Sequence, residues 1–89
     1  MITLIKGTQA ACGTDAAGAS LFGGASAVRL VNTTATARVI TVIDSVGGST
    51  TIGTFTMLGN TTEIVGKKST EAIFAADATV FGAAVGFAN

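Results

Sequence analysis

Short runs of β-branched and aromatic residues, separated by Gly, Asn and Ser, fill the chain from residue 27 onward. Within residues 51–58, polar and apolar positions alternate from Thr54 to Met57, which places Phe55 and Met57 on one face of a strand and Thr54 and Thr56 on the other. Such runs between turn residues are typical of β-strands. We therefore expect strands over residues 2–5, 27–32, 37–44, 51–58, 62–66, 70–74 and 79–88.

Two of these strands carry apolar residues at nearly every position. Residues 37–44 hold Val and Ile on both faces, a pattern that favours a central strand covered on both sides. In residues 79–88, Phe81, Val85 and Phe87 share one face. We expect that face to lie in the core.

Residues 7–26 have a different texture. They are mainly Gly, Ala, Ser and Thr, and they show no clear period of 2 or 3.6. Within a single domain of residues 1–89, we expect this segment to be a flexible arm or long loop ahead of a sheet core in residues 27–89. Its apolar pair, Leu21 and Phe22, would either fold back onto the chain's own core or anchor the segment to a neighbouring subunit.

The strands are about seven in number, and Gly-containing turns separate them at a regular spacing of roughly 8–12 residues. This spacing predicts an all-β protein, a small antiparallel β-sandwich or barrel. One sequence does not define the order of the strands within its sheets.

Composition points to a subunit of something larger. The chain has 89 residues, of which 48% are hydrophobic and 11% charged, and its formal net charge is zero. A chain of this size buries only about 60–65% of its unfolded surface, and much of the apolar content here is Ala. Because a disulfide and an evident metal cluster are missing from the sequence, oligomerisation or docking on a larger body is the remaining route to stability.

The residue types present argue against most kinds of catalytic and metal-binding site. The sequence has no His, so a Ser-His-Asp triad and a Cys-His pair are excluded. The single Cys12 allows neither an internal disulfide nor a Cys-based zinc site. Balanced charge argues against a nucleic-acid partner, and the apolar stretch 78–88 is far shorter than the ~20 residues that a membrane span needs. We therefore expect a non-enzymatic protein without cofactor or metal.

Lys67 and Lys68 follow the expected strand at residues 62–66. We expect both at a solvated turn, where they would meet Glu63 or Glu71 as weak surface pairs. The functional alternative is a contact between this basic turn and an acidic partner surface.

Strand and turn patterns run through VRLVN (28–32), RVITV (38–42), IGTFTMLGN (52–60), EIVGK (63–67) and IFA (73–75), followed by Val80. In these patterns, which cover roughly its last two thirds, the chain resembles small virion proteins of tailed bacteriophages, particularly those of marine cyanobacteria. The resemblance implies a decoration or cement protein of the capsid, assembled in the host cytoplasm. Its partners would be the major capsid protein, identical copies, or both. A minor tail, fibre or vertex module is the alternative.

Overall fold

The computed structural model describes the backbone of residues 2–88 and the side chains of residues 3–86. Within this range the chain forms eight strands and one short 3-10 helix. No helix among these residues has the length and apolar surface needed to cross a lipid bilayer. The elements are β1 (Ile2–Ile5), β2 (Ala10–Ala11), η1 (Phe22–Gly24), β3 (Ala27–Asn32), β4 (Arg38–Ile43), β5 (Thr51–Met57), β6 (Thr62–Gly66), β7 (Ala72–Ala75) and β8 (Val80–Ala88).

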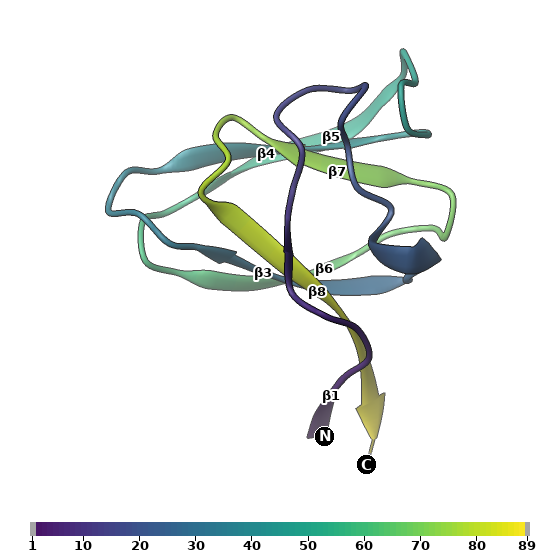
Figure 1. Ribbon diagram of the computed structural model, residues 1–89, viewed down its shortest axis with the longest axis vertical. Coiled ribbons are helices and arrows are strands. Elements are labelled where there is room, and N and C mark those ends of the chain that lie inside the picture. Colours follow the sequence, from purple (N-terminus) through teal and green to yellow (C-terminus); the bar gives the residue numbers. More distant parts are fainter. Residues whose placement is uncertain (1, 89) are drawn as a thin grey trace.

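The strands build two antiparallel sheets that lie over each other as two layers (Figure 1). The larger sheet has the order β1-β8-β3-β6, with β2 also paired to β8, and the smaller has the order β5-β4-β7. Along β8, β3 occupies one side, while β2 and β1 follow each other along the other side. β1 and the end of β8 therefore lie side by side at one end of the molecule (Figure 1).

The predicted all-β sandwich is confirmed. All seven predicted strands are present, and β3 and β6 have the predicted bounds. The eighth strand, β2, was not predicted, because its two alanines carry no periodic signal of their own.

The core lies between the two sheets. Leu30 reaches it from the larger sheet, and Ile40, Met57 and Ile73 reach it from the smaller one; all four side chains are fully buried. Phe55 is half-buried and packs against the same cluster. The inward face predicted for β5 is therefore confirmed.

The face of β8 that enters the core is the opposite of the predicted one. Val80 is fully buried in the central cluster, whereas Phe81 is only half-buried. Val85 is buried but lies outside that cluster, and the side chain of Phe87 lies outside the described residues. The prediction was wrong because it followed the larger side chains, whereas both faces of β8 are apolar and alternation does not select between them.

A glycine decides which face of β8 turns inward. A Cβ atom on Gly82 would lie 2.7 Å from the ring of Phe22 and 2.9 Å from Cδ2 of Leu30. Both larger side chains occupy the space that the missing Cβ leaves. Gly82 thus allows close packing over the middle of β8.

The strand β4 is central, as predicted, but it is covered on one face along most of its length. Ile40 and Val42 are buried against the larger sheet, whereas Val39 on the other face is exposed. Ile43 follows a register shift in the pairing with β5, and it is buried in a second cluster with Ala19. The expected cover on both faces was wrong for the first part of the strand, because a second layer lies on only one side.

Residues 7–26 form a long loop packed on the sandwich, which was one of the two expected alternatives. Its first part, β2, pairs with β8, and the backbone N of Cys12 then donates to the carbonyl oxygen of Val80 at 3.0 Å. Cys12 itself is buried in the central cluster. These contacts hold the loop against the larger sheet.

Residues 12–20, here called the crossing segment, then pass from the larger sheet to the smaller one (Figure 1). Gly13 forms a parallel bridge with Phe74, and Ser20 forms an antiparallel bridge with Ile73. Both bridges use the side of β7 that faces away from β4. The crossing segment therefore covers the edge that β7 would otherwise expose.

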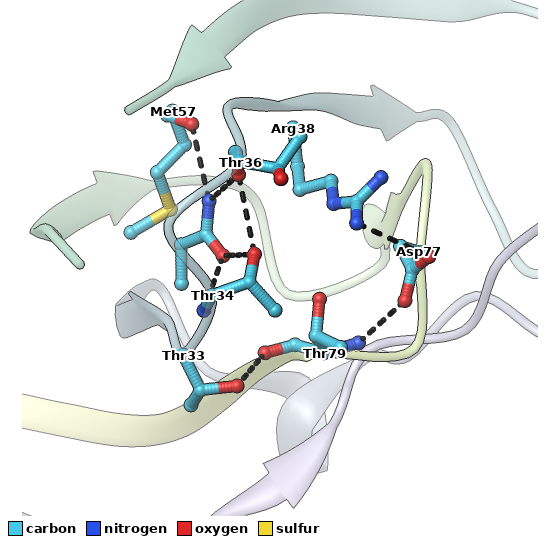
Figure 2. A network of polar contacts seen from close by, with 8 residues as sticks. Thr33, Thr34, Thr36, Arg38, Met57, Asp77 and Thr79 are labelled. Carbon is cyan, nitrogen blue, oxygen red and sulfur yellow. Dashed lines mark hydrogen bonds and ion pairs between the residues drawn. The ribbon is translucent and has the colours of Figure 1, made fainter. Parts of the chain in front are cut away.

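A fully buried amide at the end of β3 connects the two sheets. The Nδ2 group of Asn32 donates to the carbonyl oxygen of Thr36 at 2.8 Å, and to those of Met57 and Leu58 at 3.3 Å each. Its Oδ1 accepts from the backbone N and from Oγ1 of Thr34. The labelled partners surround this amide in Figure 2. Because all these groups are paired, the buried amide ties the end of β5 to β3.

A second set of polar contacts joins the β3–β4 connection to the turn before β8 (Figure 2). Thr33 Oγ1 donates to the carbonyl oxygen of Thr79 at 2.6 Å, and the backbone N of Thr79 donates to Asp77 Oδ1 at 3.2 Å. Asp77 also pairs with Arg38, at 3.5 Å between Oδ2 and Nη2. This ion pair is partly exposed, so it contributes little to stability.

Candidate interaction surface

A metal site and a reactive thiol each place requirements on the titratable side chains of the described residues. No three His, Cys, Asp or Glu side chains among them lie close enough to hold a metal ion. Cys12 is 3% exposed, and burial raises the pKa of its thiol to about 11, although a backbone hydrogen bond opposes the shift. Since the thiolate is the reactive form, this thiol is suppressed as a nucleophile.

The strand β5 is an open edge of the smaller sheet. It pairs with β4 on one side, and no other described strand pairs with it. Residues 51–54 and Thr56 are exposed, Phe55 is half-buried, and only Met57 at its end is buried. Along the outer side of β5, backbone N–H and C=O groups are therefore open to a further strand.

Hydrophobic side chains are exposed on the hairpin that β4 and β5 form. Asp44 is the single charged residue in the sequence from position 39 to position 62. The sequence contains no Pro and β5 contains no Lys, the residues with which proteins commonly protect an open strand edge. Four large side chains in and beside the hairpin are 46% to 64% exposed: Val39, Val46, Ile52 and Leu58.

The hairpin is held at both of its ends. At the turn, the backbone N of Gly47 donates to the carbonyl oxygen of Ala16 in the crossing segment at 2.7 Å. At the other end, the carbonyl oxygens of Met57 and Leu58 accept from the buried amide of Asn32. The open edge of β5 is therefore a fixed surface between two anchored ends.

Of the apolar pair Leu21 and Phe22, for which the sequence left folding back and anchoring to a neighbour as alternatives, Phe22 folds back onto the chain's own core. It packs against the central cluster over Gly82, and its backbone N donates to Ser20 Oγ at 3.1 Å. Its φ of 50° is in the left-handed region, which is uncommon for a bulky residue. Leu21 beside it is exposed, and its role as a contact to a neighbour stays a prediction.

The predicted solvated turn is correct for Lys68 and wrong for Lys67. Lys67 is 9% exposed, and its Nζ donates to the carbonyl oxygen of Lys68 at 3.3 Å. Burial lowers the pKa of Lys67, and the nearby Glu71 carboxylate opposes this shift. The backbone N of Lys67 donates to the carbonyl oxygen of Ser26, which holds the turn against the residues after η1. A contact with an acidic partner stays a prediction for both lysines.

A groove of about 690 Å³ lies between the connection from β1 to β2 and the residues around η1. Its walls include Lys6, Thr8, Ser20, Phe22 and Ala84. None of the buried polar atoms without a partner in the described residues lines it. The groove thus lacks the converging buried polar groups that orient a small ligand.

The sequence interpretation did not select the edge of β5. Finding it required the strand order, which depends on contacts between distant residues. One signal was present, because residues 39–62 contain a single charged residue and several exposed-type threonines. A stretch with so little charge can leave apolar side chains exposed together, and large exposed apolar patches commonly mark interaction sites.

The comparisons with known proteins do not assign a family. No family model, no curated protein and no solved structure matches this chain. The resemblance to small virion proteins stays a prediction.

Proposed function

We propose that this chain is a non-enzymatic structural protein that decorates or cements a bacteriophage capsid by bridging shell subunits. The observation that carries the proposal is the open, uncharged edge of β5 with Ile52 and Val39 exposed beside it. An edge of this kind recruits other strands unless something covers it. A subunit of an assembly has such a cover in its neighbours.

The phage context of the proposal comes from the resemblance of residues 28–80 to small virion proteins. The physical properties of the chain fit that context. Its zero formal charge removes net repulsion between neighbouring copies, and its short length leaves stability to be gained at an interface. The partners on this proposal are the major capsid protein, identical copies, or both, within the virion.

The mechanism is mechanical. A small rigid sandwich that contacts two adjacent shell subunits adds contacts that must break before the shell opens. The anchored ends of the β4–β5 hairpin suit this role, because a surface that is already ordered loses little conformational entropy on binding.

Copy number in the particle tests the proposal. In purified particles of the phage that encodes the chain, quantitative mass spectrometry scaled to the major shell protein should give a ratio within a few-fold of one. A handful of copies for each particle would reject cementing in favour of a tail, fibre or vertex module. Complete absence from the particle would reject a virion role.

A pair of matched variants connects this test to the surface. Thr54→Lys places a charge on the open edge, whereas Thr62→Lys places the same charge at an exposed position of β6. We expect the first variant to lower the copy number and the second to leave it unchanged. Equal incorporation of both variants would contradict a role for the edge of β5.

A further inference from the structure

We infer that β5 pairs with β5 of a second copy of this chain, antiparallel and across a twofold axis at Thr54. The two small sheets would then join into one six-stranded sheet with the order β7-β4-β5-β5-β4-β7. This inference rests on the proposed function in that it names a partner for the same edge. The test of this pairing measures dimerisation of the purified protein. The pairing can therefore fail while the chain is still incorporated into particles, and dimers can form even if the chain is absent from particles.

The length of the strand selects the position of the axis. In an antiparallel pair, opposed residues share a face, and faces alternate along each strand. A twofold axis perpendicular to the sheet must therefore lie between the two copies of one residue, which stands opposite itself. An axis at Thr54 pairs all seven residues of β5, from Thr51 opposite Met57 to Thr54 opposite itself. An axis at Gly53 or Phe55 pairs only five of them.

The inward face of β5 is complementary to itself in this register. Phe55 of each copy stands opposite Gly53 of the other. A Cβ atom added to Gly53 would meet nothing within 4 Å, so space is open there. Phe55 is only half-buried within its own chain and already packs against the core. The two rings would cover the two open positions and extend each core across the axis.

Charge favours an identical copy as the occupant. Self-pairing brings each residue near its own duplicate, so any charge close to the axis would repel itself. All seven residues of β5 are uncharged, and the outward face pairs Ile52 with Thr56. A partner of opposite charge would have no group in β5 to recognise.

The other edges of the described sheets fit this role less well. The outer side of β7 is covered by the crossing segment. β6 has five residues and carries the exposed Glu63, which an antiparallel copy would bring close to its duplicate. β1 has four residues and is followed directly by Lys6. β5 is the longest of these edge strands, and it contains no charged residue.

Charge variants at Thr54 test the pairing. We expect the wild-type protein to be a dimer by sedimentation equilibrium. Thr54→Lys and Thr54→Glu should each raise its dissociation constant by at least about tenfold, since two like charges then meet at the axis. An equimolar mixture of the two variants should restore dimers with one copy of each. Thr62→Lys, on the exposed edge of the other sheet, should dimerise like the wild type.

Three outcomes would overturn the inference. The wild type could stay monomeric up to about 1 mM, either charge variant could dimerise like the wild type, or the mixture could fail to associate. Because Thr54 is exposed, the variants should fold, and far-UV circular dichroism checks that they do.

Disulfide trapping tests the register independently of charge. Residues opposite one another in an antiparallel pair have Cα atoms about 4.5–5.5 Å apart, within the range that a disulfide spans. Thr54→Cys alone should therefore form a covalent dimer under mild oxidation. Ile52→Cys alone should not, whereas Ile52→Cys mixed with Thr56→Cys should. Cys12 is buried and does not compete. Cross-linking by Ile52→Cys alone, and not by Thr54→Cys, would overturn the proposed register.

Discussion

The two edges of the smaller sheet differ in how the rest of the chain treats them. The crossing segment lies along β7, where Gly13 and Ser20 both bridge to it. The outer side of β5 is left open among the described residues, although both ends of the hairpin are anchored. The edge at β7 is thus covered by the chain itself, whereas the edge at β5 is anchored at both ends but uncovered. On the proposed function, the second edge is the one that a partner covers.

The closed edge should be the more sensitive to a single atom. In Gly13→Ala, the new Cβ would overlap the carbonyl oxygen of Gly18 and lie 2.8 Å from the backbone N of Ala19, so the two ends of the crossing segment, which both bridge to β7, would have to move apart. We expect the free energy of unfolding to fall by about 3–4 kcal/mol. Far-UV circular dichroism during urea titration measures this, since the chain has neither Trp nor Tyr.

The control for this variant is Gly66→Ala on β6. There the nearest atom to an added Cβ is the carbonyl oxygen of Ser26 at 3.9 Å, an ordinary contact. The control should change stability by less than about 1 kcal/mol. Equal effects at Gly13 and Gly66 would mean that the close approach of Gly13 to Gly18 within the crossing segment does not contribute to stability.

The next largest loss of stability is expected at Asn32, which anchors one end of the β4–β5 hairpin. Asn32→Ala removes a buried amide and leaves the carbonyl oxygens of Met57 and Leu58 without their donor. We expect a loss of about 3 kcal/mol in the free energy of unfolding. Thr33→Ala is the matched control, because it removes one exposed hydrogen bond to Thr79 and should cost about 1 kcal/mol or less. A similar loss in both variants would contradict the anchoring role of Asn32.

The buried thiol links the crossing segment to pH. Burial raises the pKa of Cys12 from 9.0 to about 11, so the unfolded chain ionises at a lower pH than the folded one. Below pH 9 the thiol is neutral in both states, and between pH 9 and 11 the folded state loses stability, on the order of 2 kcal/mol. Urea titrations at pH 8 and pH 11 measure the loss. Cys12→Ala should lack this component, and an unchanged pH dependence in that variant would contradict the assignment.

The smallest effect is expected on the open edge itself. Ile52 is 54% exposed, so Ile52→Thr should change the unfolding free energy of the dilute monomer by less than about 0.5 kcal/mol. Urea titration at low protein concentration isolates the monomer. A loss above about 1 kcal/mol would show that the edge is already packed within the single chain, which would contradict the contrast between the two edges.

Local pattern was sufficient to predict most of the strands. β5 was readable because Thr and large apolar residues alternate in it, and β3 and β6 because turn residues bound them closely. The faces of β8 were not readable. Both are apolar, and the face with the smaller residues turns inward because Phe22 and Leu30 pack over Gly82 from elsewhere in the chain.

The surface was harder to predict than the strands. The path of residues 12–20 depends on bridges to β7, more than 50 positions away, and a Gly- and Ala-rich sequence has no local preference for that path. The turn that carries the buried Lys67 is likewise bonded to a distant residue, through the backbone N of Lys67 and the carbonyl oxygen of Ser26. Without these contacts the strand order is unknown, and without the strand order no strand can be identified as an open edge.

The pairing of β1 and β2 with β8 has a consequence for biosynthesis. Ile2 lies opposite Ala88, so the earliest strand to leave the ribosome has its partner in the latest of the described strands. During translation β1 and β2 remain without their neighbour, and the crossing segment remains without β7, until β7 and β8 have emerged. Folds that join such distant segments form slowly, in milliseconds to seconds. The nascent chain therefore carries several bare strand edges until the emergence of β8 allows the sandwich to close.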